Sequence, residues 1–351
     1  MSVFKHNISE EREGYDVNVL LDDIWHSLPY EQQKDLPPPE GGSTEGVAPE
    51  SMDDERIDSL VLTVKAPESV TALNSVKHRL TPDSSILFLQ NGMGVLEEVN
   101  EKVFPDPNTR PHYVMGITSH GLYRLRSFNI IHAGVGTTIL GTPNQASQAT
   151  KTTRHHKTAT VPVSEDAPAT TRHLLHSLTR APGLTAVHFD SVDFLQHRLE
   201  KLAINCVINP LTVIMDCTNG ELLYNYFLSR IMRLLLIEIS AVVCAMPELQ
   251  GVPGVQARFS PERLRTLTLG TASKTKNNVS STLQDVRQGK KTEIKYLNGY
   301  IVRKGEELGI KCALNYMVTQ FVHAKHKQNV NLSYGEVPLD LSGIPDLDRE
   351  K

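Results

Sequence analysis

The chain has 351 residues, of which 36 are Lys or Arg and 40 are Asp or Glu. This mildly acidic balance, with no long basic stripe, argues against a nucleic-acid partner. The most apolar run, residues 234–246, contains Glu238 and is too short to cross a bilayer, so no membrane segment is expected. A chain of this length has room for two domains.

The first half of the chain alternates between strand and helix patterns. Residues 15–21 alternate apolar and polar side chains, which predicts one short strand. Residues 29–56, rich in Pro, Gly and acidic side chains, are expected to form a disordered surface insertion because they cannot bury enough apolar surface to fold. Buried strands are then expected at 59–64 and 86–89, a further strand at 113–117, and helices at 69–80 and 95–103. This alternation predicts a parallel sheet covered by helices.

The second half is predicted to be helical after a polar connection. Residues 142–172, rich in Thr, Ser and Ala, are expected to form a mobile loop, and a short strand follows at 186–189. Asp190 can cap the next helix. From Tyr224 onward the periodicity is helical, and it predicts a core-facing stripe of Ile231, Leu234, Leu235, Ile239 and Val242.

The last helices are expected at 293–308, closed by Gly309 as a C-cap, and at 315–325. Together these patterns predict an α/β domain over residues 1–190, an all-helical domain over 191–328, and a loose tail over 329–351.

A polar stripe runs along the segment KLAINCVINPLTVIMDCTNGEL. Lys201, Asn205 and Asn209 are spaced four apart and share one face of a helix whose other positions are apolar. Burying a neutral polar group without a partner costs about 2–7 kcal/mol, so the stripe must face hydrogen-bonding partners inside the protein or in a cleft. Pro210 should end or kink the helix at Asn209, and Asn219 belongs to a second polar turn. Core amides satisfied by neighbouring backbone are the alternative interpretation.

Two turns follow the first two buried strands: residues 65–67, KAP, and residues 91–94, NGMG. In parallel sheets, ligands lie outside the carboxyl ends of the strands. The two glycines let the backbone approach a ligand closely, and the Asn91 amide offers both a donor and an acceptor. An ordinary turn is the alternative interpretation of NGMG.

A third polar group lies in residues 277–294. Asn278 and Ser281 are three apart and would share a helical face, and Glu293 follows Ser281 by twelve residues. Ser and Asn are unfavourable in the middle of a helix unless they have partners. Solvent exposure is the alternative explanation.

The segments around Lys201, Asn91 and Glu293 closely resemble the motifs of the ketopantoate reductase (2-dehydropantoate 2-reductase) family, over roughly residues 59–325. The resemblance implies a Rossmann-like N-terminal domain followed by an all-α domain of the 6-phosphogluconate-dehydrogenase-like type. It implies that Lys201 is the catalytic acid and Glu293 the catalytic carboxylate. Further contacts are implied with the substrate for Asn205, Asn209, Asn219, Asn278 and Ser281, and with the NADPH cofactor for Lys65 and Asn91.

The sequence departs from this family at its beginning. A dinucleotide-binding domain of this kind opens with a strand, a G-x-G-x-x-G turn and a helix, which hold the pyrophosphate. No such motif occurs before Ser59, and residues 132–141, which contain glycines, open no helix and resemble a strand region near the domain junction. The Rossmann-like domain is therefore expected to be incomplete, lacking its first βαβ unit.

The resemblance as a whole implies an NADP-dependent oxidoreductase that acts on a small-molecule 2-keto acid. The implied reaction is the reduction of 2-dehydropantoate to pantoate for pantothenate and coenzyme A synthesis. Two alternatives stay open: a reductase of another branched 2-keto acid, and a non-catalytic binding or regulatory protein. The four cysteines lack CxxC spacing and indicate reduced thiols, and no metal site is expected. A cytoplasmic location is expected, with the mitochondrion as the alternative, and the sequence does not define the oligomeric state.

Overall fold

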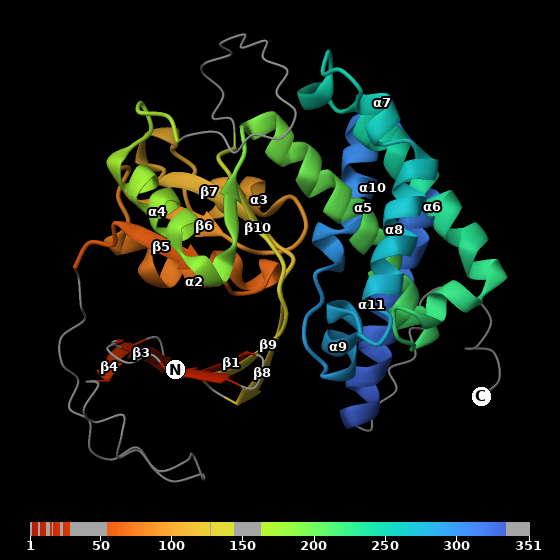
Figure 1. The fold of residues 1–351 in the computed structure, drawn as a ribbon, viewed down its shortest axis with the longest axis horizontal. Helices are drawn as coiled ribbons and strands as arrows, with labels where there is room; N and C mark the ends of the chain where they lie inside the picture. Colours follow the sequence, from red (N-terminus) through yellow and green to blue (C-terminus); the bar gives the residue numbers. More distant parts are fainter. Residues whose placement is uncertain are drawn as a thin grey trace, which may run out of the picture. The chain divides into compact units, whose positions relative to one another are not determined.

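The computed structural model describes residues 2–5, 8–11, 15, 17–21, 24–28, 55–126, 128–143 and 163–334. Contacts between residues divide the chain into two compact units (Figure 1). The sheet unit comprises Met1–Val64, Glu68–Gln90 and Glu98–Phe194, and the helical unit comprises Lys65–Pro67, Asn91–Glu97 and Leu195–Lys351. The KAP and NGMG turns therefore belong to the helical unit, although each follows a strand of the sheet unit.

A five-stranded sheet forms the centre of the sheet unit, with the strand order β11-β10-β7-β6-β5. Strands β5, β6 and β7 are parallel, β10 runs antiparallel to β7, and β11 runs parallel to β10. The strands are β5 (Ser59–Leu62), β6 (Ser85–Phe88), β7 (His112–Thr118), β10 (Thr138–Gly141) and β11 (Ala186–His188). The predicted strands at 59–64, 86–89, 113–117 and 186–189 are confirmed, and so is the parallel order of the first three.

Strands β5 and β6, both predicted to be buried, differ in their environment. All four residues of β6 are buried, and Leu87 packs with Val114, Leu174 and Leu175 in an apolar cluster. Strand β5 lies at an edge of the described sheet, and Val61 is 43% exposed. The prediction that this run is buried on both faces is therefore wrong for β5.

The helices of the sheet unit connect these strands. They are α2 (Ser69–Val76), α3 (Val95–Lys102), whose first turn belongs to the helical unit, and α4 (Ala169–Arg180). The first two confirm the predicted helices at 69–80 and 95–103. Helix α4 begins inside the stretch predicted to be a loop, so that prediction is wrong for 169–172, while 144–162 lie outside the described residues. Its sequence buries only Thr171, Leu174 and Leu175, which explains why its apolar pattern gave no clear signal.

Two smaller sheets complete the sheet unit. A four-stranded sheet has the order β2-β1-β9-β8, and β3 pairs with β4 in an antiparallel hairpin. The strands are β1 (Ser2–Lys5), β2 (Ile8–Glu11), β3 (Val17–Leu21), β4 (Ile24–Leu28), β8 (Gly121–Arg126) and β9 (Asn129–Gly134). Strand β3 confirms the strand predicted at 15–21, whereas β1, β2 and β4 were not predicted. Of the predicted insertion at 29–56, residues 29–54 lie outside the described residues.

The helical unit consists of α-helices and short 3-10 turns, and none of its described residues forms a strand. Its helices are α5 (Ser191–Met215, from Leu195 on), α6 (Tyr226–Ala245), α7 (Val255–Arg258), α8 (Pro261–Lys274), α9 (Ser281–Arg287), α10 (Asn298–Glu307) and α11 (Ala313–Tyr334). The predicted all-α architecture is confirmed. Within the described part of the chain, no helix has the length and apolar character needed to cross a membrane.

Helix α5 carries the polar stripe and begins as predicted. The side chain of Asp190 accepts hydrogen bonds from the backbone N–H groups of Val192 and Asp193, both at 2.9 Å. These bonds satisfy two of the N–H groups that a helix start leaves without an internal partner.

Pro210 does not end this helix, so of the two predicted outcomes, an end or a kink at Asn209, the first is wrong. Proline has no N–H to donate to the carbonyl four residues earlier, which belongs to Cys206. The side-chain amide of Asn298, on α10, donates to that carbonyl instead, at 2.8 Å. A partner distant in the sequence therefore replaces the missing helical bond, and α5 continues to Met215.

Helix α6 buries only part of its predicted core stripe. Leu235, Ile239 and Val242 are fully buried in the main apolar core of the helical unit. Ile231 and Leu234, predicted to belong to the same stripe, are exposed. The prediction is wrong for these two residues because α6 has apolar side chains on both its inner and its outer face.

The segment predicted as one helix over 293–308 is interrupted. A 3-10 turn, Ile294–Tyr296, is followed by Leu297, whose φ of −103° and ψ of −104° are not helical. Helix α10 then begins at Asn298, and Gly309 follows it with φ +72°, as expected for a C-cap.

The last helix is longer than predicted. Helix α11 extends to Tyr334, so residues 329–334 are helical and not part of a loose tail. Residues 335–351 lie outside the described residues.

Candidate functional site

Lys201 lies in the first half of α5, between Glu200 and Leu202. Burial of its ammonium lowers the pKa to about 8; the negative charge of Glu293 opposes this shift, and the positive charge of Arg198 adds to it. The lysine is therefore charged at neutral pH but releases its proton more readily than an ordinary lysine.

Glu293 is 5% exposed and directly precedes the 3-10 turn of Ile294–Tyr296. Its Oε1 accepts a hydrogen bond from the backbone N–H of Ala66 at 3.2 Å, and its Oε2 accepts one from Nδ2 of Asn91 at 3.3 Å. Burial raises the pKa of this carboxyl, although the two hydrogen bonds favour its charged form. The KAP and NGMG turns are thus both attached to the predicted catalytic carboxylate.

Asp285 is a member of this group that the sequence interpretation missed. It lies on α9, is 3% exposed, and its carboxylate forms an ion pair with Lys65. Its Oδ2 has no hydrogen-bond partner among the described residues, and its charge acts on Glu293 to raise the pKa of that carboxyl. The signal was available, because an acidic side chain in a short helix between buried residues requires a partner.

Backbone contacts fix the NGMG turn to the helical unit. The N–H of Met93 donates to the carbonyl of Tyr296 at 2.8 Å, and Nη2 of Arg198 donates to the carbonyl of Gly92 at 3.1 Å. Gly92 has φ +85°, and a Cβ there would lie 2.4 Å from the Tyr296 carbonyl oxygen. The glycine at this position is therefore required for the approach of a protein backbone, where the sequence had suggested the approach of a ligand.

One of the predicted amides, Asn219, is tied to the segment between α8 and α9, which contains Asn278. Asn219 donates from its backbone N–H to the carbonyl of Asn278 at 3.0 Å and from Nδ2 to Oγ1 of Thr275 at 2.9 Å. Its Oδ1 is buried and has no hydrogen-bond partner among the described residues. This amide therefore anchors the turn and keeps one acceptor available.

The other predicted polar residues are placed differently from one another. Asn209 is 7% exposed, and Asn205 is half-buried one turn after Lys201. Asn278 lies in the turn before α9, and Ser281 is the first residue of that helix, so the prediction that they share a helical face is wrong. The side chains of both are exposed.

The hydroxyl that makes hydrogen bonds at the start of α9 belongs to Ser280, not to the predicted Ser281. Its Oγ accepts from the backbone N–H of Leu283 as the N-cap of α9 and lies 2.7 Å from Oγ1 of Thr212 on α5. The start of α9 is thereby fixed against the end of the polar stripe.

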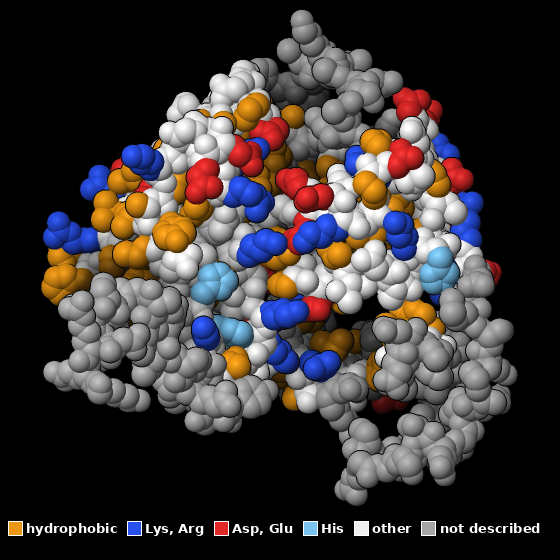
Figure 2. Space-filling view, turned by 180° about the vertical axis from the view of Figure 1, so that it is seen from behind, with side chains coloured by type: hydrophobic (Ala, Val, Ile, Leu, Met, Phe, Trp, Pro, Cys, Tyr) orange, Lys and Arg blue, Asp and Glu red, His pale blue; other side chains and the backbone are white. Residues whose placement is uncertain are grey.

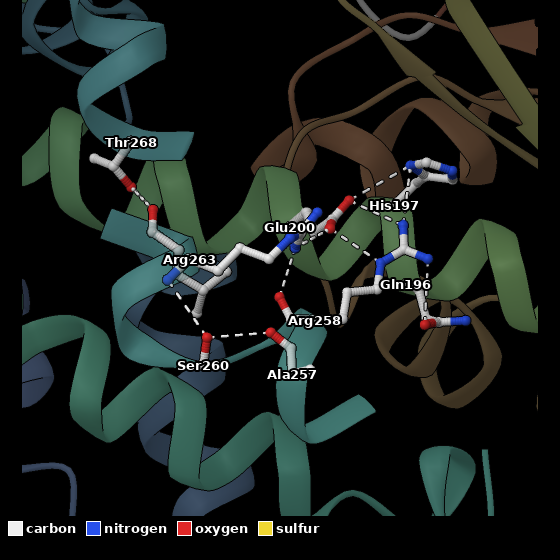
Figure 3. Close-up of polar contacts among 9 residues, drawn as sticks. Gln196, His197, Glu200, Ala257, Arg258, Ser260, Arg263 and Thr268 are labelled. Atoms are coloured by element: carbon white, nitrogen blue, oxygen red, sulfur yellow. Dashed lines mark hydrogen bonds and ion pairs between the residues drawn. The ribbon is translucent and has the colours of Figure 1, made fainter. Parts of the chain in front are cut away.

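A second charged cluster lies directly beside Lys201 in sequence (Figure 3). The carboxylate of Glu200 accepts two hydrogen bonds from Arg258, both at 3.0 Å, and one from Nη1 of Arg263 at 2.6 Å. His197 lies 3.6 Å from the same carboxylate. Hydrogen bonds from these three side chains lower the pKa of Glu200 well below its usual range, against the opposing effect of burial. The cluster attaches α5 to the α7–α8 region.

The arrangement around Lys201 can support general acid–base chemistry. It combines an ammonium that gives up its proton readily, a buried carboxylate held by two donors, and amides that can bind a polar ligand. Within the described ranges, no group of three or more His, Cys, Asp or Glu side chains is arranged to hold a metal ion. All four cysteines have free thiols.

Comparison with solved structures shows a shared two-domain fold. A structure of D-mandelate dehydrogenase with NADH and anilino(oxo)acetate matches with a TM-score of 0.57 and 22% identity, over 80% of this chain and 79% of that chain. The shared fold is a Rossmann-like parallel-sheet domain followed by an all-α domain, as expected from the sequence.

The chain belongs to the ketopantoate reductase family. The model of ketopantoate reductase PanE/ApbA matches residues 26–145, and the model of its C-terminal region matches residues 193–326. A 2-dehydropantoate 2-reductase of Vibrio cholerae is 31% identical over 75% of this chain and 76% of its own length. A probable 2-dehydropantoate 2-reductase of Schizosaccharomyces pombe is 29% identical over 76% of this chain and 73% of its own length.

Proposed function

We propose that this chain is an NADPH-dependent 2-dehydropantoate 2-reductase. It would reduce the ketone of 2-dehydropantoate to the secondary alcohol of pantoate, a step of pantothenate and coenzyme A biosynthesis. The proposal is supported by family membership and by the names of the relatives in Vibrio cholerae and Schizosaccharomyces pombe.

One observation carries the proposal: the segments that the sequence singled out independently meet at Glu293. Its two carboxylate oxygens receive hydrogen bonds from the KAP turn and from the NGMG turn, while its charge acts on Lys201 of α5. Burying a lysine and a carboxylate costs stability when the attraction between their charges does not offset the hydration that both lose. Their assembly from distant parts of the chain supports a catalytic role.

Lys201 is proposed to be the general acid. Reduction of a ketone requires a hydride at the carbonyl carbon and a proton at the carbonyl oxygen, and bound NADPH supplies the hydride. The ammonium of Lys201, with its pKa lowered to about 8, donates the proton from Nζ to the developing alkoxide. Glu293 orients Lys201 or accepts a hydrogen bond from a substrate hydroxyl.

Lys65 and Asn91 are proposed to contact the cofactor. Both follow the carboxyl ends of parallel strands, the usual ligand side of such sheets. The Lys65 side chain is 41% exposed and carries a positive charge, and Asn91 keeps its Oδ1 as an acceptor because Nδ2 is used by Glu293. These groups fit the ribose and nicotinamide part of the cofactor. The sequence has no G-x-G-x-x-G turn before Ser59 to hold the pyrophosphate, so cofactor binding needs a direct test.

The remaining predicted residues are proposed to bind the keto acid, in two roles. Asn205, one turn after Lys201, is placed to contact the substrate beside the acid, and Asn278 and Ser281 offer exposed donors to its carboxylate. Asn209 and Asn219 are largely buried, and Asn219 holds the turn that carries Asn278. We therefore assign the last two a supporting part in substrate binding.

The decisive experiment follows the absorbance of NADPH during turnover with 2-dehydropantoate. The purified chain should oxidise NADPH only when the keto acid is present, and Lys201→Ala should lower turnover by about 100-fold or more. Lys274→Ala, which removes an exposed lysine of the same unit, should leave turnover unchanged. Turnover that survives in Lys201→Ala would refute the assignment of the acid.

The same assay separates the alternative functions. Branched 2-keto acids other than 2-dehydropantoate should be reduced more slowly, and a preference for one of them would identify a different reductase. NADH should replace NADPH poorly; this comparison matters because the D-mandelate dehydrogenase with the same fold was solved with NADH.

The missing glycine motif favours one further candidate, a non-catalytic binding or regulatory protein. A fluorescence titration with NADPH, with and without 2-dehydropantoate, distinguishes it from an enzyme. Saturable binding that the keto acid tightens supports the reductase. If NADPH does not bind at any concentration, the chain as given is not a reductase.

A further inference from the structure

Asn298 is a buried amide that joins three helices of the helical unit. Figure 2 shows charged side chains of both signs spread over one face of the molecule, where water can hydrogen-bond to them. Asn298, at the start of α10, has no such access because it is 0% exposed. Its Nδ2 donates to the carbonyl of Cys206, on α5, at 2.8 Å and to Oδ1 of Asn315, on α11, at 3.0 Å. Both protons of the amide nitrogen are therefore used.

The orientation of this amide is fixed by its neighbour. Asn315 donates from its own Nδ2 to the carboxylate of Glu238, on α6, at 2.8 Å, and its backbone N–H donates to the same carboxylate at 2.9 Å. A carboxylate accepts hydrogen bonds, so Asn315 must turn its nitrogen to Glu238 and its oxygen to Asn298. Asn298 must then present its nitrogen, and no other orientation fits.

One atom of Asn298 is left without compensation. Its Oδ1 is buried and has no hydrogen-bond partner among the described residues. An unsatisfied buried acceptor lowers the stability of a fold, and such local costs are typical of functional sites. The amide is therefore explained better by what its two donated bonds hold in place than by the stability of the core.

The bond from Asn298 to Cys206 lies between the two ionisable groups of the site. Lys201 precedes Cys206 by five residues on α5. The helix is continuous here, so the position of Cys206 determines that of Lys201, about 7.5 Å away along the axis. Glu293 precedes Asn298 by the same five residues. The bond thus joins the two segments that carry the predicted acid and carboxylate.

The connection from Glu293 to Asn298 is short and hydrogen-bonded. The N–H of Tyr296 donates to the carbonyl of Glu293 at 2.9 Å, and the N–H of Leu297 donates to the carbonyl of Ile294 at 3.1 Å. Helix α10 begins directly after Leu297. A shift of Asn298 is therefore passed on to Glu293.

Apolar contacts alone do not define how α5 and α10 lie against each other. Leu202 and Ala203 of α5 and Ile301 of α10 belong to the same apolar core. Burial of such side chains is non-directional, whereas a hydrogen bond requires a narrow range of distance and angle. The bond from Asn298 therefore adds a fixed register to a contact that apolar packing leaves free to slide.

We propose that Asn298 is a positioning residue, whose bond to Cys206 sets the spacing between the ammonium of Lys201 and the carboxylate of Glu293. The inference rests on the proposed reductase function, in which Lys201 is the acid and Glu293 acts on it. A misplacement of about 1 Å can cost about 100-fold in rate. The competing role is purely structural: Asn298 would only replace the helical bond that Pro210 removes from α5.

Steady-state kinetics of Asn298→Leu gives the first test. Leucine keeps the size of the side chain and removes both donated bonds, so kcat should fall at least about 10-fold and the KM values should change less than about 3-fold. Burial lowers the pKa of Lys201 and the charge of Glu293 opposes this shift. A larger separation should therefore move the alkaline fall of turnover to lower pH. An unchanged kcat and pH profile would overturn the proposal.

Thr268→Val is the matched control. Thr268 is buried on α8, and its Oγ1 donates to the carbonyl of Leu264 in the same helix at 2.8 Å. The variant loses a buried hydrogen bond of the same unit, which should lower stability but leave kcat and the pH profile unchanged.

A second substitution, Pro210→Ala, separates positioning from the structural role. Alanine supplies the N–H that proline lacks, and this group can donate to the carbonyl of Cys206 within α5. In the double variant Asn298→Leu with Pro210→Ala, the stability to urea should recover in part, while kcat and the pH profile should stay those of Asn298→Leu. Recovery of kcat together with stability would overturn the proposal, since Asn298 would then serve only the helix.

A direct titration of Lys201 makes the test independent of turnover. Heteronuclear NMR of the lysine side chains, with Lys201→Met to assign the signal, follows the pKa of Nζ in the folded chain. This pKa should be lower in Asn298→Leu than in the parent chain. If the parent chain does not oxidise NADPH with 2-dehydropantoate, the proposed function fails, and the titration still decides the role of Asn298. An equal pKa in both chains would overturn it.

Discussion

Glu200 and Lys201 are neighbours on α5, and both side chains carry charges into the interior of the helical unit. Their surroundings act on these charges in opposite ways. The carboxylate of Glu200 meets two guanidinium groups and an imidazole, and these hydrogen bonds lower its pKa. The ammonium of Lys201 loses hydration on burial, and its pKa falls to about 8.

The contrast extends to the partners of the two residues. Every hydrogen bond around Glu200 favours the charged form of its carboxylate, so folding strengthens the ionisation that the side chain has in water. Around Lys201, the pKa of Glu293 is raised by burial, and Asp285 keeps one oxygen without a hydrogen-bond partner among the described residues. The first group stabilises the fold, and the second is held in a state that a ligand or a proton transfer can relieve.

The largest expected effect is a loss of turnover on substitution of Glu293, which lies in the group around Lys201. Glu293→Gln should lower turnover by about 100-fold or more, because it removes the charge that acts on Lys201 while keeping the side-chain shape. The free energy of unfolding should change little, since removal of a buried charge offsets the loss of one of the two hydrogen bonds that the carboxylate accepts. Glu307→Gln, at an exposed residue of α10, is the control. Steady-state kinetics and urea unfolding measure the two quantities, and a loss of stability without a loss of turnover would reverse the assignment.

At the Glu200 cluster we expect a loss of stability and no direct effect on catalysis. Glu200→Gln leaves the charges of Arg258 and Arg263 without their carboxylate, so the free energy of unfolding should fall by about 3 kcal/mol, the low end for a broken buried pair. We choose the low end because the Arg263 side chain is 41% exposed. Glu262→Gln breaks an exposed pair with Arg233 in the same unit and should cost less than about 1 kcal/mol. Equal losses in both variants would contradict a structural role for the Glu200 cluster.

Opposite pH dependences should separate the two groups further. Because folding lowers the pKa of Glu200 from its ordinary 4.5, the stability it contributes is present above pH 4.5 and is lost as the pH falls through the lower folded value. Folding lowers the pKa of Lys201 from 10.5 to about 8, so its charged form is disfavoured and stability rises between these two values as the lysine loses its proton. Urea unfolding at acid and at alkaline pH measures both effects. The loss of stability at low pH should occur in the parent chain and in Lys201→Met but not in Glu200→Gln. The alkaline rise should disappear in Lys201→Met; slopes identical to those of the parent chain would contradict both shifts.

Four of the five strands of the central sheet were predictable because they contain short apolar runs, such as residues 86–88 of β6. Strands β1 and β2 were missed because their sequences, SVFK and ISEE, have no apolar run, and their pairing with β9 depends on a segment more than a hundred residues away. Helix α6 was correctly located, but its buried face was not, because apolar periodicity on both faces does not indicate which face meets the core.

The candidate site was predictable in part for a similar reason. Lys201, Asn91 and Glu293 stand out locally as polar residues in apolar or turn sequences, and the resemblance assigned them roles. Asp285 and its partner Lys65 are 220 positions apart, and no local pattern joins them. The continuation of α5 through Pro210 was equally hidden, because the amide that replaces the missing donor comes from Asn298.

The smallest effect is expected at Arg198, which lies between the two groups. Its guanidinium donates to the carbonyl of Gly92, and its charge adds to the lowering of the Lys201 pKa that burial begins. In the parent chain turnover should fall as the pH rises above about 8, because the acid loses its proton. Arg198→Met should move this fall to higher pH, by on the order of 1 pH unit, since one nearby positive charge is lost.

Arg198→Lys keeps the charge and should leave the alkaline fall of turnover in place, which makes it the control for that shift. If a variant loses only the hydrogen bond to Gly92 and keeps the charge, the NGMG turn is disturbed. The KM for NADPH should then rise, and the pH profile of turnover should not change. If both variants change KM and neither moves the profile, Arg198 only supports the turn. The low pKa of Lys201 would then come from burial, and its contrast with Glu200 would rest on hydration alone.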